Sequence, residues 1–81
     1  MKLINIGFGN LINSDKILTV LSPDSAPAKR IISDAKAQKR LIDATQGRKT
    51  ESVIITDSDH VVLSYLQSED ILNRNNQTKE G

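Results

Sequence analysis

The stretch SVIITDSDHVVLSYL, residues 52–66, sets the fold class of this chain. It holds two runs rich in β-branched residues, 52–56 and 60–66, on either side of the turn-forming residues 57–59. β-Branched side chains favour extended backbone, and two such runs joined by a short polar connection are typical of a hairpin. The sequence therefore predicts two neighbouring antiparallel strands here.

Upstream of this hairpin, the spacing of the apolar residues indicates two more strands and then a helix. Residues 2–8 alternate between two sets of side chains with a period of two, and residues 16–21 (KILTVL) are mostly aliphatic, so both are predicted strands. Asp24 or Ser25 can cap a helix over residues 26–39. The residues expected to face the sheet are Ala28, Ile31, Ile32, Ala35 and Leu41.

The remaining segments complete an α+β fold. Residues 41–45 (LIDAT) are a predicted strand, and residues 67–74 a short helix that Ser68 can cap and that Ile71 and Leu72 can dock. The predicted order is β-β-α-β-β-β-α. It gives a small, mostly antiparallel sheet covered on one face by the main helix, together with a short C-terminal helix.

The chain is short for a protein that folds alone. Its 81 residues form one expected domain, residues 1–74, followed by a polar tail, residues 75–81, that is expected to be disordered. Small domains are often stabilised by disulfides, metals or a partner subunit. The chain has no cysteine and one histidine, which excludes disulfides and thiolate metal sites. We therefore expect no cofactor, and self-association in which a neighbouring copy shares the second face of the sheet.

The sequence also bears on location. The N-terminal residues MKLINIGFGN lack the long apolar core and the cleavage site of a signal peptide. No stretch approaches the ~20 apolar residues of a membrane span. We expect a cytoplasmic protein with no membrane partner.

Basic residues are concentrated in one part of the chain, although the net charge is only +1. Residues 29–49 hold seven lysines and arginines against Asp34 and Asp43, a local excess of +5. Such a concentration favours an anionic partner, with duplex DNA as the first hypothesis. The alternatives are an ordinary solvated helix face and a scaffold module that binds an acidic protein. One phenylalanine and one tyrosine are too few for binding single strands by base stacking.

Three short motifs suggest catalytic or nucleotide-binding chemistry, and each fails on its spacing. Residues 7–9 (GFG) lack the third glycine and the following helix of a dinucleotide fingerprint. Residues 47–50 (GRKT) lack the first glycine of a P-loop, since Ile42 stands there. Residues 57–60 (DSDH) match neither a calcium loop nor a nucleophile elbow, so His60 is expected to bond one of the acidic turn residues. No enzyme activity, catalytic residue or metal site is expected. A glycine-set loop that presents two cations survives, and it suits phosphate contacts.

Four motifs, in order along the chain, resemble the RemA family of bacterial regulators of extracellular-matrix (biofilm) genes. They read INIGFGN, SPDSAPAKR, LIDATQGRKT and VIITDSDHVVLS, and the resemblance covers residues 3 to about 66. The resemblance implies a DNA-binding transcriptional regulator that forms a homo-oligomeric ring. It further implies contacts with double-stranded DNA along that ring, at the nucleoid.

The resemblance also implies which cations contact DNA. The family's functional basic positions correspond here to Lys16 and to the adjacent pair Arg48 and Lys49, with Lys29 and Arg30 as candidates for supporting contacts. Lysine stands at 16 and 49, where arginine is typical of the family. Lysine keeps the charge but lacks the bidentate fork of arginine, so these two positions suit phosphate better than base edges.

Overall fold

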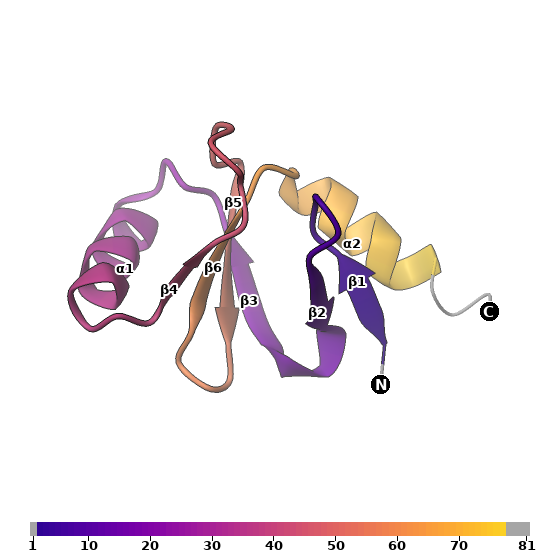
Figure 1. The fold of residues 1–81 in the computed structure, drawn as a ribbon, viewed down its shortest axis with the longest axis horizontal. Coiled ribbons are helices and arrows are strands. Elements are labelled where there is room, and N and C mark those ends of the chain that lie inside the picture. Colours follow the sequence, from indigo (N-terminus) through magenta and orange to yellow (C-terminus); the bar gives the residue numbers. More distant parts are fainter. Residues whose placement is uncertain (1, 78–81) are drawn as a thin grey trace.

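The computed structural model describes residues 2–77, and the side chains of residues 2–74. It shows an α+β fold in three layers (Figure 1). The layers are the first helix, a four-stranded sheet, and a two-stranded hairpin together with the second helix. The elements follow in chain order: β1 (Leu3–Asn5), β2 (Leu11–Asn13), the 3-10 helix η1 (Ser14–Lys16), β3 (Ile17–Leu21), α1 (Ala26–Ala37), β4 (Leu41–Asp43), β5 (Ser52–Thr56), β6 (Val61–Ser64) and α2 (Ser68–Gln77).

The predicted hairpin of residues 52–66 is confirmed, and it forms the centre of a four-stranded sheet. Strands β5 and β6 pair antiparallel, with Ile54 opposite Val62. β3 joins β5 antiparallel and β4 joins β6 parallel, so the strand order is β3-β5-β6-β4. β1 and β2 form a separate antiparallel sheet. Most strand pairs are therefore antiparallel, as predicted, but the strands lie in two sheets instead of one.

Helix α1 covers one face of the four-stranded sheet, as predicted. The Ser25 hydroxyl accepts a hydrogen bond from the Ala28 amide and caps the helix, and a proline lies in the first turn. Ala28 and Ala35 are buried against strand residues that include Val53, which lets the helix lie close to the sheet. The helix ends at Ala37, earlier than predicted, because Lys39 has a left-handed backbone with φ 60°.

The opposite face of the sheet is covered by the chain itself, which corrects the expectation that a neighbouring copy shares it. Ile54 and Val62 point into a second cluster with Ile4 of β1 and Ile71 of α2. The Ser64 hydroxyl ties the two sheets together by donating to the Ile6 carbonyl over 2.9 Å. The expectation was wrong because β1 and β2 fold back as a hairpin and form a covering layer.

The hairpin of β1 and β2 replaces the long strand predicted over residues 2–8. The alternating pattern holds through Ile6, since Ile4 and Ile6 are buried, but β1 ends at Asn5. The next residues turn the chain: Gly7, Phe8 and Gly9 all have positive φ. Phe8 is consequently 45% exposed, not part of an apolar strand face.

Helix α2 packs on the β1 side of the molecule. Ile71 docks it and is buried, but Leu72, which was also expected to dock, is exposed. Arg74 clamps the helix to β1 by donating to the Asn5 carbonyl over 2.6 Å. The helix continues past the predicted end at Arg74 to Gln77, and residues 78–81 of the predicted tail lie outside the described residues.

Candidate functional site

A short loop between β4 and β5 presents the cations of the GRKT motif. Asp43 begins it: one carboxylate oxygen accepts from the Thr45 amide over 2.9 Å and from the Thr45 hydroxyl over 2.6 Å. The Thr45 carbonyl then accepts from the Arg48 amide over 3.0 Å. Gln46 and Gly47 make the bend with φ of 53° and 83°. These contacts fix the backbone that carries Arg48, so the loop is ordered although its tip is exposed.

The charge of Asp43 is part of this arrangement. The hydrogen bond from the Thr45 hydroxyl, and then that from the Thr45 amide, lower the pKa of the Asp43 carboxyl, while slight burial acts in the opposite direction. Both hydrogen bonds favour the ionised form. The loop is therefore held by a carboxylate at neutral pH.

The turn between β1 and β2 lies at the same end of the molecule as this loop (Figure 1). The Asn5 side chain accepts from the Gly7 amide over 2.8 Å, and the Asn10 side chain donates to the Gly7 carbonyl over 2.9 Å. Gly7 lies directly against Tyr65, because a Cβ added at Gly7 would come within 2.3 Å of the Tyr65 ring. The turn is thus tied down on both sides and packed on an aromatic ring.

Arg48 lies over two aromatic rings at this end. Its guanidinium carbon is 5.8 Å from the centre of the Phe8 ring and 5.6 Å from that of Tyr65. The two rings contact each other, with centres 4.9 Å apart. Both distances from Arg48 are within the range of a cation–π interaction. Among the side chains described, those of residues 2–74, neither Arg48 nor Lys49 takes part in an ion pair.

Lys16 lies at the other end of the sheet, and one chain does not bring it together with Arg48 and Lys49. The Lys16 carbonyl accepts from the Asp57 amide, next to the β3 residue that pairs with Thr56. The loop with Arg48 precedes Ser52, so the length of β5, about 13 Å at ~3.3 Å per residue, separates the two sites. The Lys16 ammonium is also 3.8 Å from the Asp57 carboxylate. Its side chain is 60% exposed.

Lys29 and Arg30 are exposed in the first half of α1, the helix that covers one face of the four-stranded sheet. They lie nearer to the Arg48 end than to the Lys16 end, because β3 pairs Leu21 with Val53 before the chain enters α1. Arg40 has a different role in the same basic segment. It donates to the Asp59 carbonyl over 2.7 Å and also to the Gln38 side chain, which fastens the β5–β6 turn to the end of α1.

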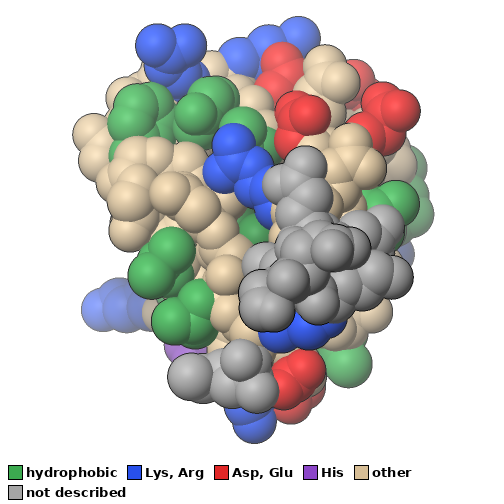
Figure 2. All heavy atoms as spheres, turned by 90° about the vertical axis from the view of Figure 1, so that its right-hand side faces the viewer, with side chains coloured by type: hydrophobic (Ala, Val, Ile, Leu, Met, Phe, Trp, Pro, Cys, Tyr) green, Lys and Arg blue, Asp and Glu red, His purple; other side chains and the backbone are tan. Residues whose placement is uncertain are grey.

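Several large apolar side chains are exposed around the two sheets. Figure 2 views the molecule from the side of α2 and shows hydrophobic side chains at the surface with lysine and arginine side chains around them. Among the large apolar side chains that are exposed, Leu18 has the greatest exposure, at 67%, because the pairing of β3 with β5 shifts between Ile17 and Thr19. The others are Leu3, Phe8, Leu11, Ile42 and Leu72.

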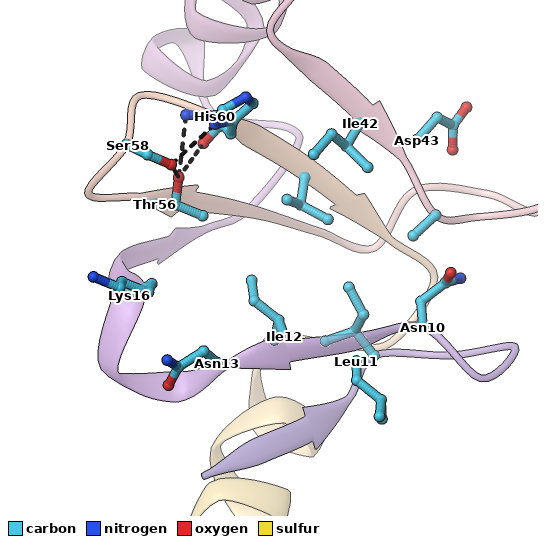
Figure 3. A pocket seen from close by; sticks show the side chains of 13 residues that line it. Asn10, Leu11, Ile12, Asn13, Lys16, Ile42, Asp43, Thr56, Ser58 and His60 are labelled. Atoms are coloured by element: carbon cyan, nitrogen blue, oxygen red, sulfur yellow. Dashed lines mark hydrogen bonds between the residues drawn. The ribbon is translucent and has the colours of Figure 1, made fainter. Parts of the chain in front are cut away.

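Some of these side chains border two grooves of about 380 Å³ each. The first groove runs between β2 and β4, with Ile12 and Ile42 on its opposite sides and Lys16 and His60 at one end (Figure 3). The second lies between β3 and α2, and Leu72 lines it. Since β4 and β3 are the two edges of the sheet, the grooves open at opposite edges.

His60 has a structural contact, although not the expected one. Its Nδ1 lies 2.9 Å from the Ser58 hydroxyl, and its backbone exchanges hydrogen bonds with Thr56. The sequence predicted an acidic partner, Asp57 or Asp59, but the serine between them takes that place. Within residues 2–74, no three acidic, histidine or cysteine side chains are grouped closely enough to hold a metal ion. None of the helices in the described part of the chain is long and apolar enough to span a membrane.

Sequence reasoning missed Phe8 and Tyr65 as parts of this site. The sequence patterns predict only strand positions for Tyr65 and Phe8. The available signal was the position of Phe8 between two glycines, since glycine supplies the positive φ that turns require and favours a turn over a strand here. Its meeting with Arg48, 40 positions along the chain, depends on the fold.

The fold and the loop together define a small α+β protein that presents cations at one end of a three-layered domain. Comparison with known proteins makes this more specific. Residues 3–74 match the RemA-like family, described as extracellular matrix regulatory protein A-like. The chain belongs to this family.

Relatives in several bacteria cover almost the whole chain. A protein of Geobacillus thermodenitrificans is 60% identical over 91% of this chain and 85% of its own length. One from Thermoanaerobacter sp. is 58% identical over 99% of this chain and 83% of its own length. One from Trichormus variabilis is 55% identical over 91% of this chain and 84% of its own length. Each is named "Putative regulatory protein".

Proposed function

We propose that this protein is a DNA-binding transcriptional regulator, not an enzyme, and that it binds duplex DNA through Arg48 and Lys49. The observation that carries the proposal is the setting of these cations. Both are exposed on a pinned loop, and neither takes part in an ion pair within residues 2–74. A cation with no carboxylate partner is available to neutralise a phosphate. The relatives' names support a regulatory role, and the family description connects it with the extracellular matrix.

One copy of the chain offers too few neighbouring cations for tight binding. Affinity for duplex DNA comes largely from phosphates neutralised and counterions released, and it rises with their number. A homo-oligomer repeats the Arg48 loop along one duplex, so that modest contacts add up through avidity. We therefore include a homo-oligomeric ring in the proposal.

The two grooves support head-to-tail assembly. They open at opposite edges of the sheet, and exposed apolar side chains border both, among them Ile42 at the first and Leu72 at the second. A contact between two different surfaces of the same molecule repeats from copy to copy and closes into a ring when the rotation allows it. Apolar side chains buried in such a contact would also add stability to a small domain.

In this proposal, Lys16 contributes to DNA binding only when the chain is assembled. Within one copy it is separated from Arg48 by the length of β5, and it lies at the end of the first groove beside Asp57. Its contribution to DNA binding therefore requires assembly to bring it near the loop of another copy. Lys29 and Arg30, exposed on α1, can add contacts at the edge of the bound duplex.

Titration of fluorescently labelled duplex DNA with the protein tests the proposal. Arg48→Ala and Lys49→Ala should each weaken binding to unrelated duplexes by about tenfold or more, the magnitude of a hydrogen bond to a charged group. Lys36→Ala is the matched control, because it removes an exposed cation from the second half of α1. Its affinity should stay near that of the wild type.

Two results would contradict the proposal. One is equal weakening by all three variants, which would mean that the loop has no special role. The other is a wild-type protein that binds no duplex at moderate salt. Binding to an acidic protein in that case would favour a scaffold module that uses the same loop.

A further inference from the structure

We infer that Phe8 and Tyr65 are positioning residues: they form an aromatic platform that holds the Arg48 guanidinium in place before DNA arrives. The inference rests on the proposed function, since it concerns how Arg48 meets DNA. It extends that function to two uncharged residues from other parts of the chain. The platform is defined here as the rings of Phe8 and Tyr65.

The platform has the geometry of a double cation–π contact. The Arg48 guanidinium lies within 6 Å of both ring centres, at 5.8 Å from Phe8 and 5.6 Å from Tyr65. The rings are tilted by 42° and contact each other. They therefore support the planar guanidinium together, and a side chain that meets two rings is more restricted than one that meets a single ring.

The two rings of the platform are themselves held in place by the hydrophobic cluster and by the β1–β2 turn. Tyr65 is half-buried and packs against the second hydrophobic cluster. Gly7 lies so close to the Tyr65 ring that no other residue type would leave the ring where it is. The same turn holds Phe8 in a left-handed conformation with φ 56°, secured by the side chains of Asn5 and Asn10. The ring of Phe8 is thus placed by its backbone, although it is 45% exposed.

The platform distinguishes Arg48 from Lys49. A free arginine side chain samples many rotamers, and binding a phosphate must restrict them. A guanidinium already held on two rings has part of that freedom removed in advance. Lys49, for which no ring contact is found among the described side chains, acts as a point charge without such a support. Removal of the platform should therefore weaken DNA binding without changing the number of charges that bind.

The variant Phe8→Leu tests this, because it keeps an apolar side chain of similar reach and removes the ring. We expect its affinity for duplex DNA to fall by about two- to fivefold or more, the range of an exposed cation–π contact. The dependence of affinity on salt should keep the wild-type slope, since the phosphates contacted are the same in number. Phe8→Tyr retains a ring at this position and should restore the wild-type affinity.

A double-mutant cycle separates positioning from a general loss of structure. In a chain that carries Arg48→Ala, the change Phe8→Leu should have no further effect on DNA affinity, because there is no guanidinium to hold. In a chain that carries Lys49→Ala, the same change should weaken binding as much as it does in the wild type. Equal effects of Phe8→Leu in both backgrounds would overturn the inference.

A measurement without DNA keeps the inference distinct from the proposed function. In NMR spectra of the free protein, Arg48→Ala should shift the ring-proton signals of Phe8 and Tyr65, whereas Lys49→Ala should leave them in place. A wild-type protein that binds no duplex would overturn the proposed function together with the role of the platform. Wild-type affinity in Phe8→Leu, or unshifted ring signals in Arg48→Ala, would overturn the inference alone.

Discussion

The negative charge of Asp43 helps to hold the backbone of the Arg48 loop in place. Its carboxylate accepts two hydrogen bonds from Thr45, and these hold its pKa below the ordinary value for an aspartate. A carboxyl whose pKa is lower in the folded chain than in the unfolded chain stabilises the fold above its unfolded pKa of ~4. That contribution is lost as the pH falls through the folded pKa. The Arg48 loop should therefore loosen in acid.

The variant Asp43→Asn measures the contribution of the charge, because an asparagine oxygen can still accept from Thr45. We expect the wild type to have the larger free energy of unfolding at pH 7. The difference between the two proteins should shrink below about pH 4, because the carboxyl of the unfolded chain takes up a proton at a higher pH than that of the folded chain. Urea unfolding at pH 7 and pH 3 gives both values, and a difference that is the same at the two pH values would contradict this account.

The basic residues show what the sequence reveals at this scale and what it does not. The charge excess of residues 29–49 could be read directly, and so could the glycine that sets the Arg48 loop. The contacts of Arg40 could not, because its partner, the Asp59 carbonyl, is distant in sequence and comes near only through the parallel pairing of β4 with β6. The count of basic residues in this segment therefore includes Arg40, whose side chain stabilises the fold through hydrogen bonds.

At the scale of elements, the turn between β1 and β2 decides the geometry of the site. It reverses the chain so that the hairpin covers the sheet, and it brings Phe8 to the loop of Arg48. Gly7 and Gly9 both have positive φ, at 117° and 79°, but their surroundings differ. A Cβ at Gly7 would collide with the Tyr65 ring, whereas nothing lies within 4 Å of a Cβ at Gly9.

The pair Gly7→Ala and Gly9→Ala separates backbone strain from steric collision. Gly9→Ala should lower the free energy of unfolding by about 1 kcal/mol, from the left-handed backbone alone. Gly7→Ala adds a collision with an aromatic ring, and its cost should reach roughly 2–4 kcal/mol. Urea unfolding measures both changes. Equal costs would mean that Tyr65 moves away freely, and that the platform is not fixed from below.

Elements with local signals could be predicted, and those that depend on distant contacts could not. The hairpin of β5 and β6 and the helix α1 follow from β-branched runs, helical spacing and the Ser25 cap. The end of β1 was missed because the alternating pattern runs on to Phe8, and only the backbone of Gly7, Phe8 and Gly9 stops the strand. The separate sheet of β1 and β2 was not predicted for the same reason.

At the scale of the whole molecule, the three layers leave two grooves, which we propose as the contact surfaces between copies. The grooves lie on either side of the β1–β2 hairpin, and the cations of the Arg48 loop lie at one end of the sheet, beside Tyr65 and Phe8. The sequence correctly predicted the α+β class and suggested self-association from the small size of the chain. It placed the shared surface on the second face of the sheet, which the chain covers itself.

The variant Ile42→Asp tests whether the first groove is an assembly surface. Ile42 is 48% exposed at the groove, and a charge there would be buried in a head-to-tail contact at high cost. We expect the wild type to have a mass several times the 8.9 kDa of one chain, and Ile42→Asp to shift toward 8.9 kDa. Ser33→Asp, on the exposed side of α1, adds the same charge and should keep the wild-type mass. Light scattering in solution decides between them, and a wild-type mass of one chain would contradict the assembly.

The salt dependence of DNA binding tests the central claim most directly. Affinity for a duplex should fall steeply as salt rises in the wild type, because each phosphate neutralised releases counterions. The double variant Arg48→Ala and Lys49→Ala should bind more weakly and show a clearly smaller slope of log affinity against log salt. A double variant that keeps both the affinity and the slope of the wild type would contradict the claim that this loop binds DNA.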